Sequence, residues 1–272
     1  MREKYRGRLA PSPTGYLHIG HIRTFEVAMK RAREENGILV LRIEDLDRER
    51  CRDEYERAIY EDLKYFGFVW QEGPDVGGEF GPYRQSERME LYRKVWRELK
   101  KGGFLFPCWR SRRDMEEAPR GPHGNEVVYP VEWRPAEEAA LFYDEAAGMN
   151  WRFRVPIGRR VEFVDGRVGN YSALAGKDFG DFPVWRKDDV PAYELAVVVD
   201  DWAMRITEVV RGEDLLLSTC RQLLIYEAMG WEPPAFYHVP LVLGTDGRKL
   251  SKRDGASRAA YQARMILEKS EN

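Results

Sequence analysis

Cysteine, histidine and long apolar runs are all scarce in this chain of 272 residues. The three cysteines, Cys51, Cys108 and Cys220, are too few and too widely spaced to form a disulfide framework. No apolar run approaches the roughly 18 residues of a membrane-spanning helix. The charged beginning of the sequence has no apolar segment of the kind found in secretion signals. These absences predict a soluble, cytoplasmic protein without a membrane partner.

Charge is abundant but nearly balanced, with 44 Lys and Arg against 46 Asp and Glu and a net charge of −2. Its distribution is uneven, since residues 44–62 hold nine acids against four arginines. Residues 248–272 hold seven bases against three acids. A basic segment of this kind suits a phosphate-bearing ligand, although most charged runs are solvated helix faces.

The first part of the chain has the order strand, helix, strand. An extended segment ends at Leu9 and Ala10, and a helix is expected from Gly20 to Glu35. The apolar run Ile38–Ile43 is typical of a strand that is buried on both faces. This βαβ unit predicts a parallel sheet with a ligand crevice at the carboxyl ends of its strands.

The middle of the chain is rich in proline and loops, and a hairpin is predicted over residues 161–168. We therefore expect an α/β domain of two halves, residues 1–102 and 183–272, separated by a loop-rich α+β insertion over residues 103–182. Ser86, Asp45 and Asp47 are expected as helix caps. The remaining predicted elements are helices over residues 87–101, 215–229 and 257–268 and strands over residues 206–210 and 239–243.

Two short segments have the composition of phosphate-binding sites. Pro11–His21 leads into a helix and holds His18 and His21, which helical spacing places side by side. A helix start favours phosphate, and Gly20 leaves room for a nucleotide base beside the backbone. The cations of Lys249–Arg253 suit a polyphosphate. Either segment alone is more typical of an ordinary surface loop, so only the pair indicates a nucleotide site.

The sequences His18-Ile19-Gly20-His21 and Lys249-Leu250-Ser251-Lys252-Arg253 resemble the two signature motifs of class I aminoacyl-tRNA synthetases. Four further segments, in the same order, resemble the glutamyl branch of that family. They are Arg8–Gly15, Leu41–Asp45, Gly81–Arg88 and Val210–Asp214. The resemblance implies a Rossmann-like, parallel-sheet, nucleotide-binding catalytic domain.

Within the glutamyl branch, full glutamyl-tRNA synthetases continue into an anticodon-binding domain, whereas this sequence ends 19 residues after Arg253. Glu44–Asp47 and Arg211–Thr219 also look more like the short relatives, the glutamyl-queuosine tRNA(Asp) synthetases. That resemblance implies a ligase that converts L-glutamate and ATP to glutamyl-adenylate. The ligase then passes glutamate to the queuosine base in the anticodon of tRNA(Asp). DNA is not an expected partner.

Two alternatives remain open. One is a truncated glutamyl-tRNA synthetase that charges the tRNA 3′ end. The other is an inactive paralogue that only binds RNA or glutamate, although such a protein would not need both signature motifs.

The resemblance assigns the glutamate pocket to Arg8, Ser12, Glu44, Tyr193 and Arg211. The chemistry agrees, because glutamate has two carboxylates and one ammonium group. Arginine makes paired hydrogen bonds to carboxylate that lysine cannot copy, and Glu44 is placed to meet the ammonium. The alternative for Glu44 is a structural ion pair with an arginine.

The resemblance assigns ATP binding to His18, Gly20, His21, Lys249 and Lys252, and catalysis to His18, His21 and Lys252. In the implied reaction, the substrate carboxylate attacks the α-phosphorus and pyrophosphate leaves. The carboxylate is already ionised at neutral pH, so the step requires positioning and charge stabilisation, with Mg²⁺ on the phosphates.

Relatives often bind zinc in the insertion through three cysteines and a tyrosine. Here Cys108 and Tyr129 are present, but Arg110 and Trp133 stand in the other two places. One thiolate and one phenol do not supply the four ligands of structural zinc. We therefore expect no zinc, with Arg110, Trp133 and Trp109 holding this region by packing or cation–π contact.

Overall fold

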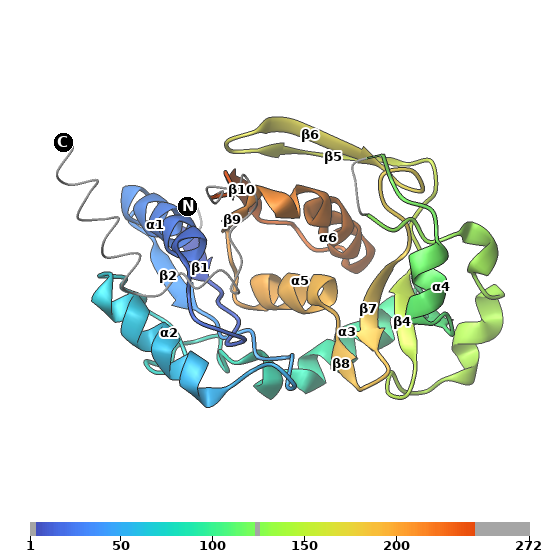
Figure 1. The fold of residues 1–272 in the computed structure, drawn as a ribbon, viewed down its shortest axis with the longest axis horizontal. Coiled ribbons are helices and arrows are strands. Elements are labelled where there is room, and N and C mark those ends of the chain that lie inside the picture. The colour runs from blue at the N-terminus through green and yellow to red at the C-terminus, as the bar shows by residue number, and fades with distance from the viewer. Residues whose placement is uncertain (1–3, 123–125, 243–272) are drawn as a thin grey trace. The chain divides into compact units, whose positions relative to one another are not determined.

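The computed structural model describes residues 4–122 and 126–242, and the chain divides into two units (Figure 1). The first unit comprises residues 1–87, 205–214 and 235–272, and the second comprises residues 88–204 and 215–234. Each unit is therefore built from segments that are far apart in the sequence. The expected halves, 1–102 and 183–272, and the insertion over 103–182 stay predictions.

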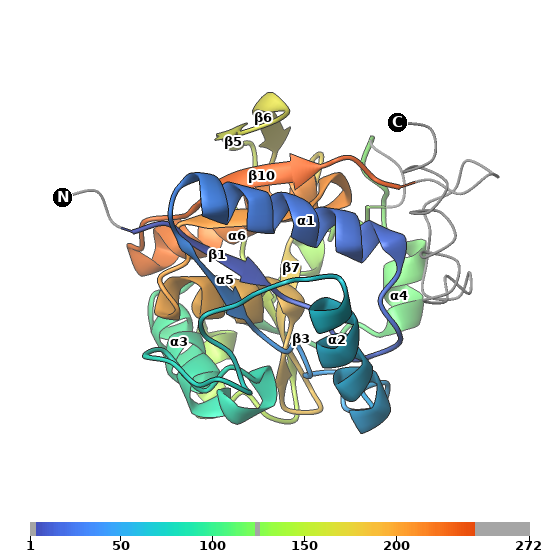
Figure 2. The same cartoon turned by 90° about the vertical axis from the view of Figure 1, so that its left-hand side faces the viewer.

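The first unit is an α/β structure built on two parallel strand pairs, β1–β2 and β9–β10. In the first pair, Arg6 lies opposite Ile38 and Leu9 opposite Leu41. Helix α1 connects β1 to β2 and packs against β1, β2 and β9 (Figure 2). This arrangement confirms the predicted βαβ unit. Its elements are β1 (Arg6–Leu9), α1 (Ile19–Glu34), β2 (Ile38–Leu41), α2 (Asp53–Tyr65), η1 (Gln85–Glu87), β9 (Glu208–Gly212) and β10 (Ala235–Val239).

Helix α1 buries one apolar stripe. Ile19, Ile22 and Phe25 are each no more than 7% exposed, and they pack with Leu9 and Leu41 in one hydrophobic cluster. The spacing of these residues at three and four positions explains why the segment is a helix that covers the strands. The packing holds the carboxyl ends of β1 and β2 in fixed positions beside the start of α1.

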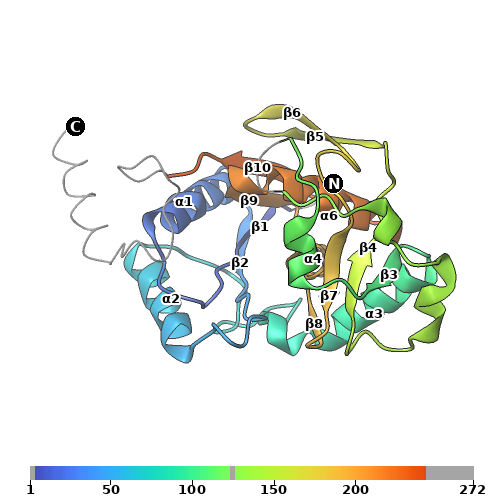
Figure 3. The same ribbon diagram turned by 45° about the vertical axis from the view of Figure 1, so that its right-hand side comes forward.

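The second unit contains an antiparallel sheet in the order β3-β4-β7-β8 (Figure 3). Helices α3 and α5 pack against this sheet. A hairpin joins β5 to β6, and the Asp165 carboxylate accepts from the backbone N–H groups of Arg167 and Val168 at its turn. This hairpin confirms the prediction over residues 161–168. The elements are α3 (Met89–Lys101), β3 (Leu105–Cys108), α4 (Arg112–Glu117), η2 (Val131–Trp133), η3 (Glu137–Phe142), β4 (Asn150–Phe153), β5 (Arg160–Asp165), β6 (Gly169–Leu174), β7 (Phe182–Arg186), β8 (Val190–Pro191), α5 (Tyr193–Ala203) and α6 (Leu216–Met229). A short 3₁₀ helix, η4 (Glu213–Leu215), precedes α6.

Two expected boundaries were wrong. The strand expected over residues 239–243 is β10, which ends at Val239, because Pro240 has no N–H group to continue a ladder. Helix α3 begins at Met89 with no side-chain cap, since the Ser86 hydroxyl instead donates to Asp45 at 2.5 Å.

The expected capping role of the two acidic residues was also wrong. Asp45 accepts from the backbone N–H and hydroxyl of Ser86, and Asp47 pairs with Arg50. Helix α2 begins after Arg52 without a side-chain cap.

The helix expected over residues 257–268 lies outside the described residues. Among the helices of residues 4–122 and 126–242, none is long and apolar enough to span a membrane.

Candidate active site

The start of α1 is closed by two histidines. His18 is the N-cap residue, and its Nδ1 atom accepts from the backbone N–H of Gly20 at 3.1 Å. In return, Nδ1 of His21 accepts from the backbone N–H of His18 at 3.1 Å, and the ring centroids lie 3.8 Å apart. A neutral imidazole that accepts at Nδ1 carries its proton on Nε2. Both rings therefore have an N–H donor on the edge away from the cap, beside the positive end of the helix dipole.

Gly20 is required locally by this cap. A Cβ atom at this position would lie 2.9 Å from Cε1 of His18, which is closer than side-chain contacts allow. The residue was predicted to give a nucleotide room beside the backbone, and the structure adds a reason that does not depend on a ligand. The donor edges and the helix start together fit a phosphate group.

Two buried arginines lie at the carboxyl ends of β1 and β9. The Arg8 guanidinium donates to the carbonyl oxygen of Val210 at 2.8 Å, so it reaches the backbone directly before Arg211. Arg211 donates from Nε to Nε2 of His238 at 3.2 Å, and its guanidinium lies 5.6 Å from the Phe236 ring centroid. Arg8 and Arg211 are each 5% exposed, so the carboxyl ends of these strands have two cations held in fixed directions.

His238 is a residue that the sequence motifs did not identify. It lies on β10, is fully buried, and faces Arg211 across the parallel pair β9–β10. Because its Nε2 atom accepts from Arg211, a neutral ring carries its proton on Nδ1. The sequence held one indication, since His238 is one of only four histidines and lies in a strand that is otherwise mostly apolar.

Glu44 and Ser12 lie together after β2 and β1. The backbone N–H of Glu44 donates to the carbonyl oxygen of Pro11 at 3.0 Å, which places Glu44 beside Ser12. The Glu44 carboxylate also accepts from Arg42 at 3.0 Å, and the Arg42 side chain is fully buried. The ion pair that the sequence left as an alternative is therefore present, and it fixes the direction of the Glu44 carboxylate.

Of the ten predicted site residues, the structure describes eight, and the seven of these in the first unit gather at one edge of its strands. Arg8 and Arg211 lie near the carboxyl ends of β1 and β9, and Ser12 and Glu44 follow β1 and β2. His18, Gly20 and His21 form the start of α1. Tyr193 belongs to the second unit, where it begins α5 with 41% of its surface exposed. Lys249 and Lys252 lie outside the described residues.

The residues at the place where relatives often bind zinc do not fit a zinc ion. Sγ of Cys108 lies 3.6 Å from the Tyr129 hydroxyl and accepts from Nε of Arg152 at 3.4 Å. Burial, followed by the hydrogen bond to Cys108, raises the pKa of the Tyr129 phenol, so it remains protonated. Within the described residues, no three His, Cys, Asp or Glu side chains form a cluster able to hold a metal.

Cation–π contacts take the place of ligands in this region. The guanidinium of Arg110 lies 4.6 Å from the Trp133 ring centroid, and that of Arg152 lies 4.6 Å from the Tyr129 ring centroid. Trp109, which was expected to contribute to packing, is 58% exposed. The absence of zinc stays a prediction, and the contacts provide a physical basis for it.

Comparison with known proteins agrees with the geometry. The family described as "tRNA synthetases class I (E and Q), catalytic domain" matches residues 4–265. A glutamate–tRNA ligase from Sulfurihydrogenibium sp. (strain YO3AOP1) is 44% identical over 255 residues, which cover 92% of this chain and 53% of that protein. A glutamyl-Q tRNA(Asp) synthetase from Nitratidesulfovibrio vulgaris is 44% identical over 252 residues, which cover 91% of this chain and 78% of that protein.

A solved structure has the same fold. The glutamate–tRNA synthetase from Elizabethkingia anophelis superposes with a TM-score of 0.81 at 36% identity, covering 93% of this chain and 53% of that one. The present chain thus spans about half the length of the curated glutamate–tRNA ligases that it matches. The predicted Rossmann-like α/β fold is confirmed, and the chain belongs to the catalytic-domain family of the glutamyl and glutaminyl class I tRNA synthetases.

Proposed function

We propose that this chain activates L-glutamate with ATP and transfers the glutamyl group to a tRNA. The observation that carries the proposal is the pair of buried arginines, Arg8 and Arg211, at the strand ends of the unit whose first helix is capped by His18 and His21. Buried guanidinium groups bind carboxylates, and a histidine-lined helix start binds phosphate.

Each residue has a distinct part in the proposed reaction. Arg211 and Arg8 bind the glutamate carboxylates, and Glu44 meets the ammonium group. The Nε2–H groups of His18 and His21 donate to phosphate oxygens and stabilise charge that moves toward the leaving pyrophosphate. Lys252 supplies a further cation, and Tyr193 completes the amino-acid pocket. Bound Mg²⁺ would neutralise phosphate charge.

For the acceptor, we propose the queuosine base in the anticodon of tRNA(Asp). The segments Glu44–Asp47 and Arg211–Thr219 support it, because they look like those of the short relatives. The relative from Nitratidesulfovibrio vulgaris also supports it. The 3′ end of tRNA is a second candidate, favoured by the identity of 42% to 44% with glutamate–tRNA ligases. In either case we propose that the protein acts in the cytoplasm, binds no zinc, and has neither DNA nor a membrane as a partner.

The first experiment measures glutamate-dependent exchange of pyrophosphate into ATP without tRNA. Exchange is expected for either acceptor, and its absence would support the inactive paralogue instead.

The second experiment offers two forms of tRNA(Asp) with radiolabelled glutamate. One carries queuosine but lacks its terminal adenosine, and the other has an intact 3′ end but no queuosine. Labelling of the first form alone is expected. Labelling of intact tRNA regardless of queuosine would refute the queuosine acceptor and support 3′ charging.

A further inference from the structure

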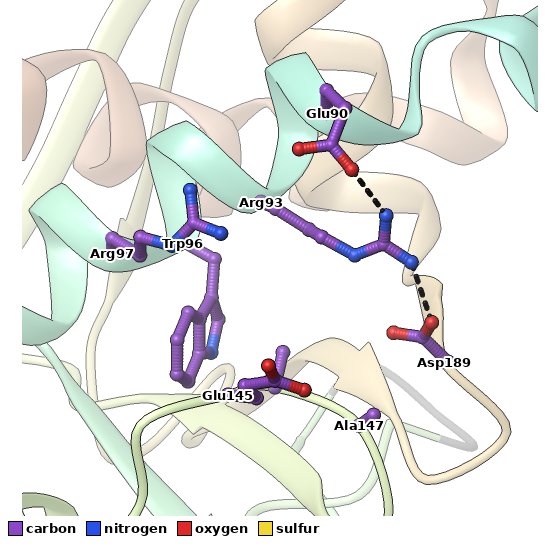
Figure 4. Close-up of a pocket in the computed structure, with 8 residues that line it drawn as sticks. Glu90, Arg93, Trp96, Arg97, Glu145, Ala147 and Asp189 are labelled. Atoms are coloured by element: carbon purple, nitrogen blue, oxygen red, sulfur yellow. Dashed lines mark hydrogen bonds and ion pairs between the residues drawn. The ribbon is translucent and has the colours of Figure 1, made fainter.

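The second unit contains a cavity of about 210 Å³ that none of the proposed site residues lines (Figure 4). Helix α3, the segment 145–147 and the turn between β7 and β8 form its walls. Since a water molecule takes about 30 Å³ of the liquid, the space fits several waters or one small organic molecule.

A buried hydrogen-bond donor faces this cavity. Trp96 lies on α3 and is 1% exposed, and its indole Nε1 has no hydrogen-bond partner. Figure 4 shows the nitrogen-bearing edge of the ring turned toward the cavity. The ring cannot easily rotate, because it packs edge-on against Trp151 at 4.9 Å. Burying a donor without a partner is unfavourable, so an acceptor in the cavity would stabilise this part of the protein.

The indole N–H of the neighbouring Trp151, by contrast, has a hydrogen-bond acceptor. Nε1 of Trp151 donates to the carbonyl oxygen of Ala146 at 3.1 Å. That bond fixes the segment that forms one wall of the cavity. The unpaired donor of Trp96 therefore differs from that of the neighbouring indole, which is paired.

The charged groups around the cavity fall into two sets. Arg93 is fully engaged, since it donates to Glu90 and to Asp189 at 2.6 Å each. Arg97 and Glu145 have no ion-pair or hydrogen-bond partner within the described residues. The groups left for a ligand are thus one buried N–H donor, one cation and one anion.

We propose that this cavity binds a small free α-amino acid. Its carboxylate would accept from Nε1–H of Trp96 and pair with Arg97, and its ammonium group would face Glu145. A simple anion would leave Glu145 unused, and a simple amine would leave the Trp96 donor unpaired. Only a molecule with both charges close together complements all three groups.

The test follows the indole N–H resonances of the whole chain by two-dimensional ¹⁵N–¹H NMR during titration with L-alanine. Trp96→Phe keeps an aromatic ring and identifies the Trp96 resonance by its loss. L-alanine has no side-chain carboxylate for the proposed glutamate pocket, so this resonance reports on the cavity independently of the proposed activity. A saturable shift at millimolar concentration is expected, with a much smaller one for propionate or ethylamine.

Charge variants complete the test. Arg97→Gln and Glu145→Gln are each expected to weaken L-alanine binding about tenfold, the effect of about 1.4 kcal/mol. Lys94→Gln and Glu98→Gln make the same changes on α3 away from the cavity and should leave the affinity unchanged. The proposal is overturned if the Trp96 indole N–H contacts only water and its resonance shows no saturable shift with L-alanine. It is also overturned if Arg97→Gln and Glu145→Gln bind as tightly as the parent chain.

Discussion

At the scale of single residues, the proposed recognition of glutamate depends on how Arg211 is held. Its Nε atom is committed to His238, which leaves the direction of the guanidinium fixed for a carboxylate. Arg211→Lys keeps the charge but loses both the paired guanidinium donors and the hydrogen bond to His238. We expect the KM for glutamate in pyrophosphate exchange to rise about 100-fold, since each factor of ten corresponds to about 1.4 kcal/mol of binding free energy.

We expect His238 to act on the proposed reaction as a positioning residue, through its hydrogen bond with Arg211. His238→Phe keeps a ring of similar size and removes only the acceptor, so we expect a KM for glutamate raised about tenfold with the KM for ATP unchanged. Arg57→Lys, an exposed change on α2, is the control. Equal increases in both KM values would indicate a general loss of structure rather than positioning.

Cys108 provides a second test at this scale. Because its thiol accepts from Arg152 and packs among aromatic rings, Cys108→Ser should lower the free energy of unfolding by about 1–2 kcal/mol without abolishing folding. Purified parent protein should contain no stoichiometric zinc by elemental analysis, and chelators should not change its urea transition. One zinc per chain would contradict this account, and Cys51→Ser serves as the matched control.

At the scale of elements, the start of α1 combines a structural cap with a proposed phosphate contact, and substitution can separate them. Asparagine is a good N-cap residue but lacks an Nε2–H donor, whereas alanine loses both functions. We expect His18→Asn to keep the free energy of unfolding within about 0.5 kcal/mol of the parent and His18→Ala to lower it by about 1 kcal/mol. Both should reduce the rate of pyrophosphate exchange about 100-fold, the range for loss of one transition-state donor.

These variants are measured by urea denaturation and by exchange kinetics. If His18→Asn retained full exchange activity, the ring would serve only as a cap. If both variants lost the same stability, the cap geometry would not explain the helix start.

Local patterns predicted the elements that depend on local chemistry. The apolar stripe of α1 and the continuous run of β2 follow from neighbouring residues, and both were found where expected. Contacts between distant segments were not predictable. The bond between Ser86 and Asp45 joins residues 41 positions apart, and it displaces the cap that either side chain would make alone. The bond between Arg211 and His238 likewise requires the register of β9 with β10, which no local pattern contains.

At the scale of the whole molecule, the three cysteines lie in different environments. Cys51 is partly exposed, whereas Cys108 and Cys220 are buried. Burial raises the pKa of the Cys220 thiol to about 12, and the thiolate is the reactive form. Cys220 lies on α6 and Cys108 on β3, so both are reached only when the second unit opens.

We therefore expect the native protein to have one rapidly alkylated thiol and two protected ones. Iodoacetamide labelling followed by peptide mass mapping should find Cys51 modified first. Raising the pH to about 10 should still leave Cys220 neutral, because its pKa lies about two units higher. Labelling of Cys108 and Cys220 should increase in urea together with the unfolding transition, because access then requires opening of the fold. Native labelling of Cys220 as fast as that of Cys51 would contradict the buried position of α6.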